Sequence, residues 1–226
     1  MTAKKKWRTP PPSQPREVLP AQNRGKIAIG LVVVVGLVLL SSFIFANRPG
    51  ASTGKGKQSA FPYAIANPAS GTLAPDFTLP STKGGTVKLS DYHGKTVLLF
   101  FHEGIGCQPC WDQIRDLERG ASELKSSGID QLLTITSGPT RLIAQKMADD
   151  GLSSVALGDT NLEVSKIYHA NQYGMMGDSR DGHSFVLVGP DGKIDWRADY
   201  GGPPKYTMYV PIASILSDMK AGRIQS

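Results

Sequence analysis

Strand-like and helix-like patterns of apolar residues alternate along the chain from about residue 71 onward. Short apolar runs bounded by glycine, proline or polar residues predict strands over residues 76–79, 86–89, 95–101, 131–136, 153–157, 184–188 and 193–198. The run Val97–Phe101 contains no polar residue, which is typical of a central strand buried on both faces. Gly84-Gly85 and Gly189–Gly192 separate neighbouring runs and predict tight turns.

Apolar residues at near-helical spacing predict four helices among these strands. The helices cover residues 109–127, 139–150, 160–168 and 211–221. Thr160 and Glu163 have the spacing of a capping box, which predicts that Thr160 caps the third helix. The order of elements is a β-hairpin, then βαβ, αβα and ββα, and it predicts one α/β domain over residues 71–222.

A different pattern occupies the N-terminal part of the chain. Residues 27–46 form a run of twenty residues without a charge, and a helix of that length is about 30 Å long, the thickness of bilayer hydrocarbon. The Leu, Ile, Val and Phe residues in the run favour insertion by roughly 6 kcal/mol. We therefore predict that residues 27–46 form a transmembrane helix. A cleaved signal peptide is the alternative, because the small Ala46 is suited to precede a cleavage site.

The net positive charge of the chain is concentrated before this run. Residues 1–26 hold seven Lys and Arg residues against one Glu, and 7 − 1 = +6 equals the formal charge of the whole chain. This proline-rich tail is predicted to be disordered, and the positive-inside rule places it in the cytoplasm. The remaining residues sum to zero, which removes the electrostatic reason to expect nucleic-acid binding. Residues 47–58 are rich in Gly, Ser, Pro and Lys, and we predict that residues 47–70 form a flexible tether to the domain.

The candidate chemistry is concentrated in Cys107-Gln108-Pro109-Cys110, which holds both cysteines of the chain. Two cysteines three residues apart at the start of a helix lie close to the Cα separation that a disulfide requires. A crosslink across so short a loop adds little stability, and structural zinc generally takes four Cys or His ligands. The pattern therefore predicts redox chemistry, with a stabilising crosslink and a metal site as alternatives.

The position of each cysteine on the helix predicts its role. Cys107 lies at or before the first turn, where free amide groups and the helix dipole favour a thiolate, so we predict that it is the nucleophile. Cys110 lies one turn into the helix and is expected to be more buried. We predict that Cys110 attacks the mixed disulfide, releases the thiol of the partner and closes the Cys107–Cys110 bond.

Four stretches of the sequence can be compared with a known family, namely Ala74–Leu79, Lys88–Lys95, Phe100-Phe101 and Cys107–Cys110. Together they resemble the redoxin branch of the thioredoxin superfamily. The greatest similarity is to membrane-anchored thiol-disulfide oxidoreductases of the TlpA/ResA type, which are related to the AhpC/TSA peroxiredoxins. The resemblance implies an α/β thioredoxin-like fold, with a central mixed sheet flanked by helices.

The chain departs from this family pattern before a late strand. Where thioredoxins place a cis-proline beside the disulfide, the chain has Gly182 and His183. These two residues are the candidate substrate-docking loop.

A second departure lies on the strand before the cysteines. The family pattern has a buried acid there, whereas this chain has Phe100 and Phe101. The nearest substitutes as proton acceptors for Cys110 are Glu103 and His102, and we take Glu103 as a candidate catalytic residue.

Two further functions stay open as alternatives. Peroxiredoxins carry Pro and Thr or Ser before the reactive cysteine and an Arg near the later strand, where this chain has Phe100, Gly104 and Gly182. A peroxiredoxin-like thiol peroxidase is the first alternative. A copper assembly factor of the Sco type is the second, with His169 or His183 joining the two thiols as a ligand.

The sequence as a whole predicts a single-pass protein of the cell membrane, with the N-terminus in the cytoplasm and the redox domain outside. Its expected partners are protein thiols and disulfides outside the cytoplasm, and a membrane or thioredoxin-type electron donor or acceptor. We expect no cofactor, no metal and no nucleic acid.

Overall fold

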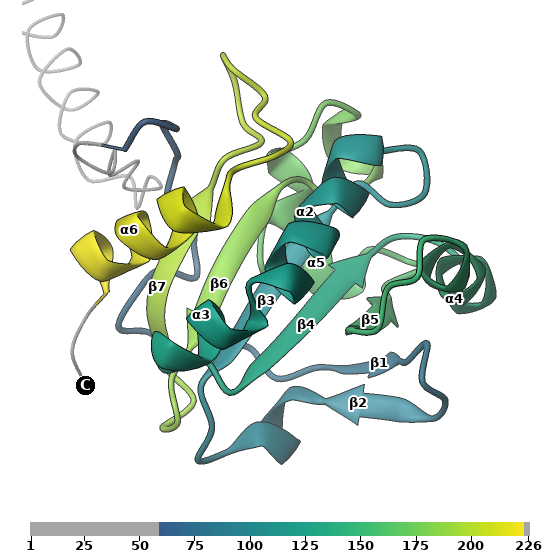
Figure 1. Cartoon of the computed structure of the whole chain (residues 1–226), viewed down its shortest axis with the longest axis horizontal. Helices are drawn as coiled ribbons and strands as arrows, with labels where there is room; N and C mark the ends of the chain where they lie inside the picture. Colours follow the sequence, from purple (N-terminus) through teal and green to yellow (C-terminus); the bar gives the residue numbers. More distant parts are fainter. Residues whose placement is uncertain (1–58, 224–226) are drawn as a thin grey trace, which may run out of the picture. The chain divides into compact units, whose positions relative to one another are not determined.

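Five strands form the central sheet of the domain, in the order β5-β4-β3-β6-β7 (Figure 1). They are β3 (Val97–His102), β4 (Gln131–Thr136), β5 (Val155–Gly158), β6 (Ser184–Val188) and β7 (Ile194–Asp199). The first three are parallel, whereas β6 and β7 are antiparallel to their neighbours. The sheet is therefore mixed, and β3 at its centre is buried along its whole length, as its apolar run predicts.

The structure, a computed structural model, describes residues 59–223. The predicted tail (1–26), the predicted span (27–46) and the first part of the predicted tether lie outside these residues. Within the described range, no helix is both long enough and apolar enough to cross a bilayer.

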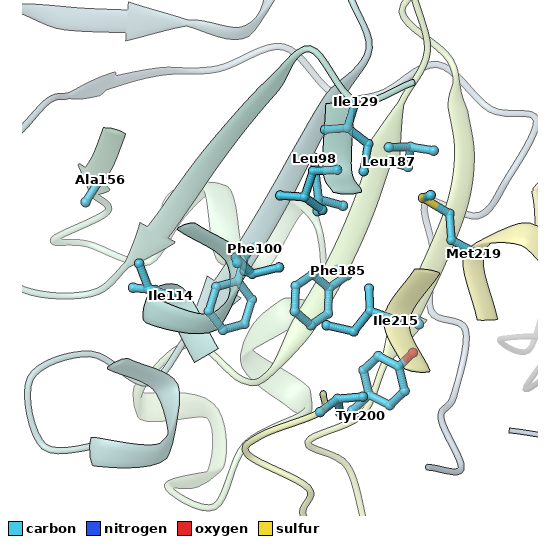
Figure 2. Close-up of a cluster of buried hydrophobic side chains, with 14 of the residues drawn as sticks. Leu98, Phe100, Ile114, Ile129, Ala156, Phe185, Leu187, Tyr200, Ile215 and Met219 are labelled. Carbon is cyan, nitrogen blue, oxygen red and sulfur yellow. The ribbon is translucent and has the colours of Figure 1, made fainter. Parts of the chain in front are cut away.

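Four helices pack on one face of the sheet. They are α2 (Gln108–Arg119), α3 (Ala121–Ser126), α4 (Thr140–Asp149) and α6 (Ile212–Gly222). Their apolar side chains share one buried cluster with Leu98 and Phe100 of β3. Figure 2 shows the rings of Phe100 and Phe185 side by side, near Ile114 of α2 and Ile215 of α6. This cluster fixes α2 over the middle of the sheet.

The opposite face is covered by smaller elements. They are α5 (Glu163–Ile167), the hairpin of β1 (Thr78–Pro80) and β2 (Thr86–Lys88), and the 3₁₀ helix η1 (Leu89–Tyr92). Phe77, Leu79 and Leu89 pack there against Leu99 and Phe101 of β3. Successive side chains of a strand point to opposite faces, so a single strand supplies both clusters. The two covered faces confirm the expected α/β architecture.

Residues 59–70, which the sequence assigned to the tether, pack against the domain. Ala64 forms a β-bridge with Asp199, and the Ala66 amide donates to the Asp199 carboxylate. Tyr63 is buried against the rings of Trp196 and Tyr200. The domain therefore begins before residue 71, because β7 offers an open edge and a buried acceptor that the composition of the segment does not reveal.

The helix expected over residues 109–127 is two helices. α2 ends and α3 begins at Gly120, where a Cβ atom would overlap the side chain of Ile212 at the start of α6. The close approach of α6 is thus the reason for a glycine at this break.

The capping box expected at Thr160 is not formed, and that prediction is wrong. The Thr160 hydroxyl donates to the Gly138 carbonyl instead. The first turn of α5 is capped by Asp159, whose carboxylate accepts from the amides of Val164 and Ser165. Asp159, directly after β5, therefore caps α5 in place of the predicted Thr160.

Candidate active site

The two cysteines form a disulfide at the start of α2. Cys107 is the N-cap residue of the helix, Cys110 lies in its first turn, and their Cα atoms are 5.3 Å apart. Residues 103–106 alone join β3 to Cys107, so the disulfide lies at the C-terminal end of the central strand. Ligands and substrates of open α/β sheets bind at this end.

The two sulfur-bearing residues differ in accessibility. Cys107 is 8% exposed and Cys110 is 0% exposed, in the order that the helix position predicts. In the part of the chain that the structure describes, no side chain caps the first turn of α2. The Cys110 and Trp111 amides donate to the Cys107 carbonyl, and Pro109 has no N–H group. The Gln108 amide and the positive end of the helix dipole therefore stabilise a thiolate at Cys107.

Met208 is the third member of the small buried cluster that contains both cysteines. It lies in the loop between β7 and α6 and is 7% exposed. Its thioether restricts the access of water to the buried end of the disulfide. Sequence reasoning missed Met208, because nothing in the spacing of residues links a methionine in that loop to the cysteines.

Two buried histidines lie at the same end of the sheet. His102 ends β3 and His183 precedes β6, and Phe100 contacts both rings. Burial lowers the pKa of each imidazole to about 3, and the nearby His102 contributes to the low pKa of His183. Both rings are therefore neutral near pH 7. His102 Nδ1 accepts from the Gly104 amide, whereas His102 Nε2 and both nitrogens of His183 have no partner among residues 59–223.

Glu103, the candidate proton acceptor, is buried directly after β3. Its Oε1 atom accepts from the amides of Met175 and Met176. Arg180 Nη1 donates to the Glu103 carbonyl at 3.3 Å. These bonds join Glu103 to the loop before β6, and within the described residues its carboxylate has no hydrogen bond to either cysteine. The catalytic role of Glu103 stays a prediction.

The candidate docking residues Gly182 and His183 are both buried. A Cβ atom at Gly182 would overlap the carbonyl oxygen of Tyr173, and the His183 amide donates to that same oxygen at 2.8 Å. The Tyr173 backbone thus occupies the space in which a proline at position 182 would stand. In this conformation a partner cannot touch Gly182 or His183, so the predicted docking role requires this loop to move.

A pair of buried carboxylates lies directly before this loop. The Ser165 hydroxyl is 2.6 Å from Asp159 Oδ2 and also contacts Asp181 Oδ1. A hydroxyl has one proton to donate, and Asp159, which caps α5, accepts it. The second contact therefore requires a proton on Asp181. Burial and the nearby Asp159 raise the pKa of Asp181 well above its usual value, which agrees with a neutral acid.

No group of three or more His, Cys, Asp or Glu side chains within residues 59–223 is placed to hold a metal ion. His169 is exposed and lies beside Gln172, whereas His183 is enclosed by aromatic rings. The described part of the chain therefore gives no support to the copper alternative.

Curated relatives include both peroxidases and disulfide exchangers. The peroxiredoxin Bcp of Escherichia coli (strain K12) is 32% identical over 130 residues, which cover 55% of this chain and 81% of that protein. The thiol-disulfide oxidoreductase ResA of Geobacillus kaustophilus is 33% identical over 100 residues, which cover 44% of this chain and 56% of that protein. Both kinds of relative agree with redox chemistry at a cysteine.

Solved structures show a thioredoxin-like fold. Peroxidoxin BcpB from Mycobacterium tuberculosis has a TM-score of 0.57 at 19% identity and covers 70% of this chain and 98% of its own. A putative thiol:disulfide interchange protein DsbE from Chlorobium tepidum has a TM-score of 0.50 at 23% identity and covers 66% of this chain and 97% of its own. The family described as AhpC/TSA matches residues 70–197. This match spans more than half of the chain, and the chain belongs to the AhpC/TSA family.

Proposed function

We propose that the protein is a thiol–disulfide oxidoreductase that exchanges the Cys107–Cys110 disulfide with the thiols of other proteins. The observation that carries the proposal is the arrangement of the two sulfurs. The more accessible one lies at the N-terminus of a helix, where a thiolate is stabilised, and the second is fully buried one turn later.

The exchange proceeds through two attacks of thiolate on disulfide. A partner thiolate attacks the Cys107 sulfur, a mixed disulfide forms, and Cys110 leaves as a thiolate that takes up a proton. A second thiolate of the partner then attacks the partner's own sulfur in the mixed disulfide, which forms the partner disulfide and releases the Cys107 thiolate. Two electrons pass from the partner to the cysteine pair, and the reverse sequence reduces a partner disulfide.

Peroxide reduction is the second candidate function, because the relatives include peroxiredoxins. Two glycines argue against it. Gly104, where the peroxidase pattern has Thr or Ser, has a φ of +87°, and a Cβ there would lie 2.8 Å from Thr136 Oγ1. Gly182, in place of the Arg, has no room for a side chain beside Tyr173. Neither side chain of the peroxidase pattern fits this backbone.

A Cys110→Ser variant tests the proposal. When it is mixed with a protein disulfide, it should accumulate a mixed disulfide through Cys107, because the sulfur that releases the partner is missing. The adduct is measured as a band on a non-reducing gel that disappears on reduction.

Cys107→Ser is the matched control and should form no adduct. Absence of an adduct with Cys110→Ser would contradict the exchange reaction. Rapid, stoichiometric consumption of hydrogen peroxide by the reduced wild type, lost in Cys107→Ser, would support the peroxidase instead.

We also propose that residues 27–46 anchor the chain in the cell membrane and that the domain works outside the cytoplasm. The uncharged length of this segment and the basic residues before it support the proposal. Clients would then be extracytoplasmic proteins, served by a membrane or thioredoxin-type electron donor or acceptor. Protease added to intact cells should digest the domain, and full protection of the domain would contradict this location.

A further inference from the structure

Glu103 fastens the loop before β6 to the loop before the disulfide. Its carboxylate accepts hydrogen bonds from two consecutive amides, those of Met175 and Met176, which lie 72 and 73 residues later in the sequence. In Figure 1 this green loop lies beside the end of α2 that carries the cysteines. Buried carboxylates are retained where hydrogen bonds compensate their loss of water, and here the compensation comes from the loop.

The ends of the same loop are fixed as well. At its start, Gly174 is buried, and a Cβ there would lie 2.7 Å from Glu103 Oε1, so the glycine permits the approach of the carboxylate. At its end, Arg180 donates to the Glu103 carbonyl. Between these two points residues 175–179, which include the 3₁₀ helix η3 (Gly177–Ser179), are exposed. The loop is thus held at the backbone while its side chains face solvent.

The fixed loop and the segment that leads to Cys107 both expose apolar side chains. Met175 is 64% exposed and Met176 is 54% exposed, and Ile105, two residues before Cys107, is 40% exposed. Methionine side chains are flexible and adapt to apolar partners of different shape.

A mixed disulfide brings a partner against this region. The Cα atoms of two disulfide-bonded cysteines lie about 4.4–6.8 Å apart, so the partner's backbone must pass close to Cys107. Gly106 alone separates Cys107 from Ile105, and Glu103 links that short segment to Met175 and Met176. Residues that flank the partner's cysteine therefore pass Ile105, and the segment that carries Ile105 is bonded through Glu103 to the loop with the two exposed methionines.

We propose that Glu103 is a positioning residue: it holds Met175 and Met176 in place to receive apolar residues that flank the reacting cysteine of a partner polypeptide. This inference rests on the proposed exchange reaction. It assigns Glu103 a role through hydrogen-bond geometry and not through proton transfer to Cys110. The preferred substrates are accordingly polypeptide thiols in an apolar sequence context, and small thiols do not benefit from the contact.

The rate at which thiols reduce the oxidised full chain tests this role. The probes are a reduced peptide with two cysteines flanked by leucines, a matched peptide with serines in place of the leucines, and dithiothreitol. The fluorescence of Trp111, the neighbour of Cys110, follows the reaction. We expect wild type to prefer the leucine peptide over the serine peptide. In Glu103→Ala this preference should fall by about tenfold, the size of effect expected for the loss of one good apolar contact. The half-saturating concentration of the leucine peptide should rise, and the limiting rate should stay the same.

Glu103→Gln separates positioning from proton transfer. The amide oxygen of Gln still accepts from both backbone amides, so this variant should keep the preference and the pH profile of wild type. A loss as large as that of Glu103→Ala would overturn the inference.

The double variant Met175→Ser/Met176→Ser tests the same contact without touching a buried group. It should lose the preference as Glu103→Ala does, whereas Leu73→Ser, an exposed apolar residue that pairs with Lys193 at the opposite end of the sheet, should keep it. An unchanged preference in the double variant would overturn the inference while the exchange reaction stands. Failure of wild type to react with any of the three probes would instead contradict the proposed function.

Discussion

At the scale of single residues, the proton on Asp181 is the feature with the clearest consequence. Asp181 is buried and shares the Ser165 hydroxyl with Asp159, and its other carboxylate oxygen has no partner among residues 59–223. An ionised carboxylate at this fully buried place would face the negative charge of Asp159. The folded domain therefore binds a proton that the unfolded chain releases in weak acid.

Asp181→Asn should remove part of the pH dependence of stability. The raised folded-state pKa of Asp181 contributes stability that is fully present below the usual pKa near 3.8 and is lost as the pH rises through the folded-state value. Asn has the shape of the protonated acid and does not titrate. The free energy of unfolding, measured with urea, should therefore fall less for the variant than for wild type between about pH 4 and about pH 8.

The exposed Asp178 offers a matched control in the same region. Asp178→Asn should leave the pH dependence of wild type unchanged. If the curves of Asp181→Asn and wild type run parallel, Asp181 is ionised in the folded domain.

At the scale of elements, the position of the loop before β6 depends on two glycines that leave room for its backbone. The Tyr173 carbonyl lies against Gly182 and also against Gly201, so that this backbone is wedged between the start of β6 and the end of β7. A methyl group at either glycine would push the three segments apart.

Gly182→Ala should therefore destabilise the domain by about 3 kcal/mol, the upper range for an overpacked site. Gly106→Ala is the matched control, because a Cβ at Gly106 meets no atom within 4 Å, and its effect should stay within about 0.5 kcal/mol. Urea denaturation of both variants measures the difference. Equal stabilities would mean that the Tyr173 backbone moves aside at little cost, and that the candidate docking loop is open to partners.

The elements could be predicted wherever a local pattern decides them. The apolar runs predicted the bounds of β4 and β6 to the residue, because the run of apolar residues is itself enough to recognise a buried strand. The break at Gly120 and the cap of α5 could not be predicted. The first depends on Ile212 and the second on Asp159, and both contacts arise only when distant segments pack together.

In the candidate site, too, local features could be predicted from the sequence and contacts between distant segments could not. Cys107 and Cys110 could be assigned from their spacing, because both the disulfide and the helix terminus are local. Met208 and the loop bonded to Glu103 come from separate parts of the chain, and no pattern in the sequence connects them to the cysteines. Tertiary contacts thus supply the surroundings of a reactive centre that the sequence itself locates.

At the scale of the whole molecule, residues 59–70 act as an added edge on β7. Arg197 and Asp199 form a fully buried ion pair. Arg197 also donates to the carbonyls of Tyr168 and of Pro68 in this segment, and Asp199 accepts from the Ala66 amide of the segment. Removal of the segment would leave buried polar atoms of this pair without these hydrogen bonds, which costs about 1–3 kcal/mol for each unsatisfied group. The segment is therefore required for the pair, and through it for the edge of the sheet.

A chain that begins at residue 71 should accordingly be less stable than one that begins at residue 59. We expect a loss of about 3 kcal/mol or more, since burial of one large side chain such as Tyr63 is worth about 2 kcal/mol. Thermal unfolding of the two chains measures the difference. Equal unfolding midpoints for the two chains would show that residues 59–70 do not contribute to the stability of the domain.

The pairing of a slightly exposed cysteine with a fully buried one also limits how many proteins can be bonded to the molecule at one time. The chain has two cysteines in all, and Cys110 is closed to solvent, so one covalent attachment is possible at a time. In the proposed exchange reaction, an electron donor and a client therefore cannot be joined to the same molecule together, and each must depart before the other arrives. We expect a full cycle of the proposed reaction to consist of two separate encounters at one sulfur, and an excess of either protein to slow the cycle by occupying Cys107.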